Sequence, residues 1–207
     1  MSAASWLRQK FGRRPPDESL EGSSLDELGF VLLDLDLTGT DATQDFVTGL
    51  ASLPLLEGTF RPVDLRYVSF AENISSDIDQ QPEIFNGYRN CMDLMENNVV
   101  VTINPNFIKH MLGLAAARFR LPQPVGTWLD LSEIAGVIGD DSLAATSLRS
   151  WQVKMKTCGS HEHDAVYDVF AMAQLLQALL AYAEESGIET LADFRRNQSA
   201  EIWMRPY

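Results

Sequence analysis

The chain has 207 residues, of which 45% are hydrophobic and 22% charged, and its formal net charge is −13. This length suits one sizeable domain with a small appendage. Only two cysteines occur, Cys91 and Cys158, which excludes a disulfide framework and a Cys/His zinc cluster. We see no apolar run of the roughly 20 residues that a membrane helix needs and no secretory signal, so we expect a cytoplasmic protein without membrane contact.

Positive charge is concentrated at the N-terminus. The first fifteen residues contain four basic side chains and no acid, so the remainder carries −13 minus +4, or −17. Such a body should repel nucleic acid over most of its surface, and any contact would be local, cation-assisted or helped by the basic arm. We divide the chain into a basic, partly disordered leader (1–27), a globular body (28–187) and a C-terminal tail (188–207). The leader is either a docking arm for a protein partner or a solvated tail.

The first half of the body predicts an antiparallel meander. An almost wholly apolar run at 30–35 predicts a central strand covered on both faces. Residues 46–56 and 63–70 predict two further strands, with a glycine-containing turn at Glu57-Gly58 between them.

The second half alternates helices and strands. We expect a helix at 82–96, a β-branched strand at 97–103, and a helix capped by Asn104 with Pro105 in its first position. Two more helices should begin near residue 131 and cover 164–186. The chain is therefore predicted to be an α/β protein with a mixed five- or six-stranded sheet and helices on both faces.

Two aspartates end the first strand. Because side chains alternate along a strand, Asp34 and Asp36 should point to the same face. In α/β sheets the carboxyl ends of strands carry the site, and two carboxylates at this spacing can share Mg²⁺ or Mn²⁺. The alternative is a polar strand end whose carboxylates cap a turn or face water.

A second acidic stretch, "HEHDAVYD" at 161–168, precedes the last long helix. We expect His163 in the preceding loop and Asp168 on the first turns, so that both side chains can reach one point above the sheet. Asp168 would add a third metal ligand, and His163 could accept a proton from a metal-activated water. The alternative is a solvated helix start whose acids suit the helix dipole.

Three segments in order resemble the motifs of one enzyme family. "FVLLDLDLTGT", "VVVTINPNFIKHML" and "HDAVYDVFAMAQLL" look like the three exonuclease motifs of the DEDDh 3′–5′ exonucleases, the group of the DNA polymerase III epsilon subunit and ribonuclease T. The resemblance covers about residues 29 to 183. It implies a ribonuclease H-like fold and two divalent metals, Mg²⁺ or Mn²⁺, that clamp the scissile phosphate.

The resemblance also implies roles for the acidic residues. Asp34 would bridge both metals, Asp36 and Asp168 would complete the tighter site, and His163 would be the general base. Asp36 stands where the family has Glu, so that it keeps the charge but has a shorter reach.

The resemblance assigns substrate contacts to the middle of the chain and also fails there. Thr38 would line the pocket for the terminal nucleotide, and Asn104 and Phe107 would support its wall. The family's fourth carboxylate is missing, because Ile108 stands in its place and Ile103 stands at the family's His position. We therefore expect one good metal site and one poor one, or an apolar core beneath a site that no longer catalyses.

Three functions remain open from the sequence. The first is a metal-dependent exonuclease, slow or specialised, that acts on the 3′ ends of single-stranded DNA or RNA. The second is a pseudoenzyme that binds a nucleotide, nucleic acid or protein, and the third is an acidic domain with an unrelated role. Basic and aromatic side chains could form a patch around the cleft, although scattered charges and core tryptophans explain them equally well: Arg118, Arg120, Arg149, Lys154, Lys156, Trp128 and Trp151.

Overall fold

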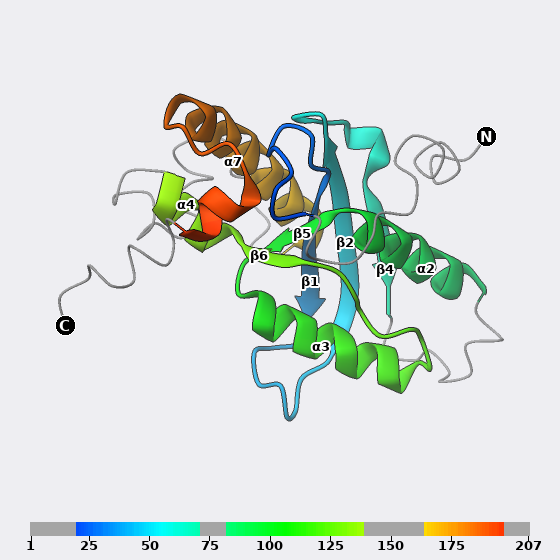
Figure 1. The fold of residues 1–207 in the computed structure, drawn as a ribbon. Helices are drawn as coiled ribbons and strands as arrows, with labels where there is room; N and C mark the ends of the chain where they lie inside the picture. Colours follow the sequence, from blue (N-terminus) through cyan, green and yellow to red (C-terminus); the bar gives the residue numbers. More distant parts are fainter. Residues whose placement is uncertain (1–19, 71–81, 139–163, 197–207) are drawn as a thin grey trace, which may run out of the picture.

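A six-stranded mixed sheet forms the centre of the protein in a computed structural model that describes residues 20–70, 82–138 and 164–196 (Figure 1). The strand order is β3-β2-β1-β5-β6, and β4 lies beside β2. The strands are β1 (Phe30–Leu37), β2 (Val47–Leu56), β3 (Thr59–Phe60), β4 (Arg66–Ser69), β5 (Val99–Thr102) and β6 (Trp128–Asp130).

The pairing of the strands confirms the predicted meander and mixed sheet. Strand β2 pairs antiparallel with β1, β3 and β4, whereas β1, β5 and β6 pair parallel to one another. The predicted turn between β2 and β3 is also present, since Glu57 and Gly58 both have positive φ, 52° and 69°. Positive φ at two central residues is what a tight hairpin turn requires.

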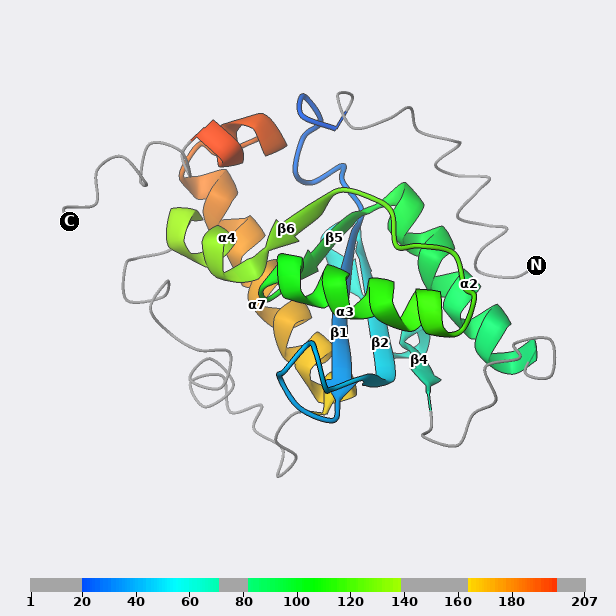
Figure 2. The same cartoon turned by 90° about the horizontal axis from the view of Figure 1, so that it is seen from below.

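Helices cover both faces of the sheet, as the sequence predicts (Figure 2). Helices α2 (Pro82–Asn97) and α3 (Pro105–Arg118) cover one face, here named the α3 face. Helices α4 (Leu131–Ile138) and α7 (Ala165–Glu185) cover the other, here named the α7 face. Alternation along β1 divides its apolar side chains between two cores: Phe30 and Leu32 lie on the α7 face, Leu33 and Leu35 on the α3 face.

Helix α7 is the longest helix in the part of the chain that the structure describes. By length and composition alone it could cross a membrane, so the expectation that no apolar stretch approaches this length was too strict. Val169, Ala173 and Leu176 are fully buried on the α7 face of the sheet. This packing is typical of a core helix.

The core of the α7 face includes residues on both sides of the predicted body. Leu25, assigned to the leader, and Leu191 and Phe194, assigned to the tail, are buried in the core of the α7 face. The two segments also contact each other, because the backbone N–H of Leu25 donates to a carbonyl at position 189 at 2.8 Å. The packed body therefore extends from about residue 20 to at least residue 194, and the rest of the leader and tail lies outside the described residues.

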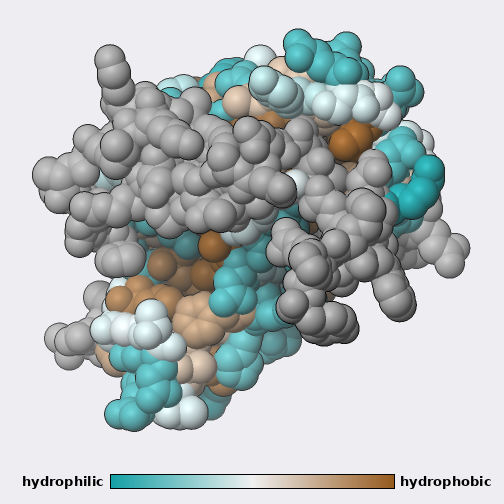
Figure 3. Space-filling model, turned by 90° about the vertical axis from the view of Figure 1, so that its left-hand side faces the viewer, coloured by the Kyte–Doolittle hydropathy of each residue, from teal (hydrophilic) through white to brown (hydrophobic). Residues whose placement is uncertain are grey.

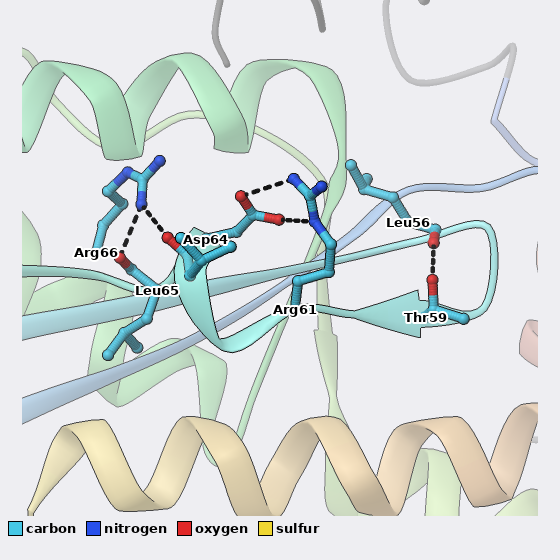
Figure 4. Close-up of polar contacts among 7 residues, drawn as sticks. Leu56, Thr59, Arg61, Asp64, Leu65 and Arg66 are labelled. Carbon is cyan, nitrogen blue, oxygen red and sulfur yellow. Dashed lines mark hydrogen bonds and ion pairs between the residues drawn. The ribbon is translucent and has the colours of Figure 1, made fainter. Parts of the chain in front are cut away.

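A short turn fixes the start of β4. The 3₁₀ helix η2 (Pro62–Asp64) connects β3 to β4, and the Arg61 guanidinium donates to both carboxylate oxygens of Asp64 at 2.7 and 2.9 Å (Figure 4). Arg66 donates to the carbonyls of Val63 and Leu65. These bonds hold the turn at both ends, directly before the β4 residues that pair with β2.

Cys91 is a core residue. Its side chain is buried in α2, and burial raises the pKa of its thiol to about 11. A thiol with this pKa is protonated at neutral pH and is a poor nucleophile. Cys158 lies outside the described residues.

Candidate functional site

The two aspartates of β1 face helix α7. Phe30 and Leu32 belong to the core of the α7 face, so alternation places Asp34 and Asp36 on the same face, as predicted. Across β2, Asp34 lies opposite Ala51 and Asp36 lies opposite Gly49. The β2 residues opposite the two aspartates therefore have a small side chain or none.

The Asp34 carboxyl lies in a strongly unfavourable place for a negative charge. Its pKa is raised to about 7. Burial is the largest cause, and the carboxylates of Asp168 and, more weakly, Asp36 also contribute. The backbone N–H of Leu35 opposes the shift. A perturbed carboxyl of this kind at a strand end is typical of functional sites, since structural packing rarely needs several acids together.

Asp36 has hydrogen bonds to both carboxylate oxygens. Oδ1 accepts from the backbone N–H of Ala165 and Oδ2 accepts from the hydroxyl of Tyr67, each at 2.8 Å. The Tyr67 pKa is raised to about 12 by burial and by the Asp36 carboxylate, so the phenol stays protonated and remains a donor. Asp36 thus joins β1 to β4 and to the first residue of α7.

Helix α7 begins directly beside the end of β1. Asp164 is its N-cap, and Oδ1 accepts from the backbone N–H groups of Val166 and Tyr167 at 3.0 and 3.4 Å. Asp168 follows one turn later and lies close enough to Asp34 to raise its pKa. The structure therefore brings Asp34, Asp36 and Asp168 to one place, as the sequence predicts for three of the four proposed catalytic residues.

Replacing Asp164 with Ala is expected to lower the free energy of unfolding by about 1 kcal/mol, because two backbone donors of α7 lose their acceptor. Urea unfolding of Asp164→Ala beside Asp164→Asn measures this effect. Asn retains a cap oxygen, so Asp164→Asn should lose less than half as much. Equal losses in the two variants would contradict the capping role.

The remaining predicted site residues belong to other segments of the chain. His163 lies outside the described residues. Thr38 starts the loop between β1 and β2, where its hydroxyl donates to Asp45 and accepts from the backbone N–H of Phe46. Asn104 is confirmed as the N-cap of α3, and it accepts from the N–H of Phe107 at 3.4 Å.

The two isoleucines that replace polar family residues pack into the apolar cores. Ile108 is 5% exposed and belongs to the core of the α3 face, whereas Ile103 packs against the core of the α7 face. Their burial supports the interpretation that they extend the core. An acid at position 108 would be buried without a cation among the core residues around it.

The fit of a divalent ion to these residues is partial. Asp34 and Asp168 supply the carboxylate oxygens that Mg²⁺ and Mn²⁺ prefer, and the Asp168 carboxylate helps to raise the pKa of Asp34 in the absence of a cation. Asp36 fits less well, because each of its oxygens accepts a hydrogen bond and would have to be shared between that donor and the ion. Within the described ranges, no three His, Cys, Asp or Glu side chains are arranged to hold a metal ion.

A small pocket lies between the β1–β2 loop and α3. Its volume is about 60 Å³, and Asp45, Phe46, Leu114 and Arg118 are among its lining residues. The Arg118 guanidinium lies 5.2 Å from the centre of the Phe46 ring, so this cation is held against the loop. Apolar side chains are exposed beside hydrophilic ones on the face shown in Figure 3.

Only some of the other basic and aromatic residues predicted to line the cleft are described by the structure. Arg120 is exposed after α3, and the ammonium of Lys109 lies 6.0 Å from the ring centre of Trp128, which is half-buried. The indole nitrogen of Trp128 is buried and has no hydrogen-bond partner among the described residues. Four predicted contacts lie outside the described residues: Arg149, Trp151, Lys154 and Lys156.

Sequence reasoning missed Tyr67 and Gly49. Tyr67 lies within a predicted strand, but its contact with Asp36 depends on the register of β4 against β2 and of β2 against β1. The only local signal is a glycine inside a predicted strand, which suggests a close approach of another group.

Comparisons with known proteins identify solved structures of similar fold. No protein-family model matches the chain, and no curated protein matches it in sequence. It is similar to the structure of E. coli exonuclease I in complex with a dT13 oligonucleotide, with 13% identity, a TM-score of 0.57 and coverage of 77% of this chain and 42% of that one. It is also similar to exonuclease I from Methylocaldum szegediense, with 14% identity, a TM-score of 0.51 and coverage of 76% and 40%.

These similarities establish the architecture. The chain has a ribonuclease H-like fold, as the sequence motifs imply, and it shares this fold with the exonuclease I structures. It spans about two-fifths of the length of the exonuclease I chains. At such low identity the likeness extends to the fold and no further.

Proposed function

We propose that the chain is a divergent, divalent-metal-dependent 3′–5′ exonuclease-like protein that acts on the 3′ ends of single-stranded DNA or RNA. One observation carries the proposal. Asp34, at the carboxyl end of the central strand, is buried and faces Asp168 and Asp36, so the sheet edge carries a negative charge that a dication would relieve.

The fold supports the choice of nucleic acid as substrate. E. coli exonuclease I, whose fold the chain shares, is bound to a single-stranded oligonucleotide in its structure. The chain itself has a formal net charge of −13, which repels a polyanion. A cation held by Asp34 and Asp168 would remove part of this repulsion where the strand must approach.

Each residue then has a distinct role. Asp34 and Asp168 would hold the ion, which when bound would supply charge neutralisation and polarisation of the phosphate. Asp36 lends negative charge to the same site. His163, as the general base, would accept a proton from the attacking water, and Thr38, Asn104 and Phe107 would contact the terminal nucleotide.

Hydrolysis of end-labelled single-stranded DNA and RNA with Mg²⁺ or Mn²⁺ tests the proposal. Asp34→Asn should lower the rate at least about 100-fold, because losing an ion-binding carboxylate costs more than losing one of its outer partners. Glu184→Gln is the matched control. It removes an exposed carboxylate of the same helix as Asp168, about 24 Å further along its axis, and should leave the rate unchanged.

A binding module is the second candidate, and the burial of Ile108 in place of a fourth carboxylate favours it. The same oligonucleotides distinguish the two functions. Binding that needs Mn²⁺ and Asp34, without hydrolysis, would identify the module. Neither binding nor hydrolysis under any of these conditions would overturn both.

A further inference from the structure

We infer that Asp36 is a positioning residue that holds β1, β4 and the start of α7 together, and that it does not ligate the ion. The group consists of Asp36, Tyr67, Gly49 and the backbone N–H of Ala165, and it is here named the Asp36 clip. The inference rests on the proposed function and deepens it, because it assigns the ion to Asp34 and Asp168.

Both oxygens of Asp36 are engaged by donors from different elements. The Tyr67 hydroxyl of β4 and the first N–H of α7 each lie 2.8 Å from one oxygen. The first N–H groups of a helix have no partner within the helix, and an anionic acceptor there also suits the helix dipole. Ligation of an ion would compete with two charge-assisted hydrogen bonds.

Gly49 makes the contact with Tyr67 possible. Strands β1 and β4 are not neighbours, since β2 lies between them, and two strand spacings amount to about 9–10 Å. The tyrosine must cross β2 to reach Asp36. A Cβ atom at Gly49 would lie 2.3 Å from the Tyr67 hydroxyl oxygen and 2.5 Å from Asp36 Oδ2, so only glycine leaves the path open.

The clip determines where Asp168 lies. It fixes Ala165, and Asp168 follows three residues later on the first turn of α7. Asp168 is thereby held near Asp34, and loss of the clip should weaken ion binding through this distance rather than through a missing ligand.

Mn²⁺ binding followed by isothermal calorimetry, with Asp36→Asn, Tyr67→Phe, the double variant and Asp34→Asn, tests the inference. Tyr67→Phe removes no carboxylate, yet it should weaken Mn²⁺ binding by about the same factor as Asp36→Asn, roughly three- to tenfold, and the double variant should be no weaker. Asp34→Asn should lose binding altogether. Tyr182→Phe, an exposed tyrosine at the other end of α7, is the control.

Two results would overturn the clip. In the first, Asp36→Asn loses Mn²⁺ as fully as Asp34→Asn while Tyr67→Phe binds normally, which would make Asp36 a ligand. If the parent protein binds no Mn²⁺, the proposed ion site fails and the clip is tested by metal-free unfolding. In metal-free unfolding each single variant should lower the folding constant about tenfold, and the double variant should lose no more than that. Additive losses in the double variant are the second result that would overturn the clip.

Discussion

Asp34→Asn is expected to raise the free energy of unfolding at pH 8 by about 2–4 kcal/mol in metal-free buffer. The folded protein raises the pKa of this carboxyl from 3.8 to about 7, mainly through burial and secondly through Asp168. One pKa unit corresponds to about 1.36 kcal/mol, and the expected gain follows from removing most of this penalty. A functional site that costs stability in this way is stabilised by losing its acid.

The sign of the pH dependence follows from linkage. A raised pKa means that the folded state holds its proton more tightly than the unfolded state, so the contribution of Asp34 to stability is fully present below pH 3.8. It is lost as pH rises to about 7 and stays lost above. The parent and Asp34→Asn should therefore unfold at similar urea concentrations near pH 4 and diverge up to about pH 7.

Urea unfolding of both proteins at pH 4, 6 and 8 in EDTA checks this expectation. An excess of Mg²⁺ or Mn²⁺ at pH 8 should raise the midpoint of the parent alone, because the variant lacks the central carboxylate. Glu184→Gln serves as the control for removing a negative charge from an exposed position. A difference between parent and Asp34→Asn that is the same at all three pH values would contradict the buried, raised carboxyl.

Gly49→Ala is expected to lower the free energy of unfolding by about 2–3 kcal/mol. Its methyl group would lie 2.3 Å from the Tyr67 hydroxyl oxygen and 2.5 Å from Asp36 Oδ2, in a strand paired on both sides. The backbone of β2 cannot move away, so the side chains must separate and the Asp36 hydrogen bond is lost. Overpacking at a rigid site costs about 1–3 kcal/mol, and the lost bond adds to it.

A second substitution shows whether the clash is with the hydroxyl. In Gly49→Ala/Tyr67→Phe the oxygen nearest to the new methyl is absent, so the double variant should be more stable than the sum of the two single losses predicts. Gly58→Ala is a comparison at an open turn position, where no described residue lies within 4 Å of the added Cβ and only the positive φ of 69° is strained. Strict additivity at Gly49 and Tyr67 would show that the two do not meet.

The sequence was informative wherever local pattern decides structure. Apolar runs and turn residues predicted strands β1, β2 and β5, the turn at Glu57-Gly58 and the Asn104 cap of α3, because each depends on a few neighbouring residues. Alternation alone placed Asp34 and Asp36 on one face. Strand and helix order then brought Asp168 to the same edge.

Other features of the site could not be predicted because they depend on register between distant strands. Tyr67 can contact Asp36 across β2 only because Gly49, which has no side chain, lies opposite Asp36. No pattern within any of these strands encodes that alignment.

Burial likewise separated residues that the sequence left ambiguous. The motifs could not say whether Ile108 lies in a core or beside the acids, and the structure places it in the core of the α3 face. Leu25 and Phe194 look like parts of a leader and a tail, yet they pack together on the α7 face. The sequence by itself determined the elements and the acids at their ends. The tertiary structure decided that Asp36 accepts hydrogen bonds from Tyr67 and Ala165 and that Asp34 is buried beside Asp168, because hydrogen bonding and desolvation depend on neighbours that only folding brings together.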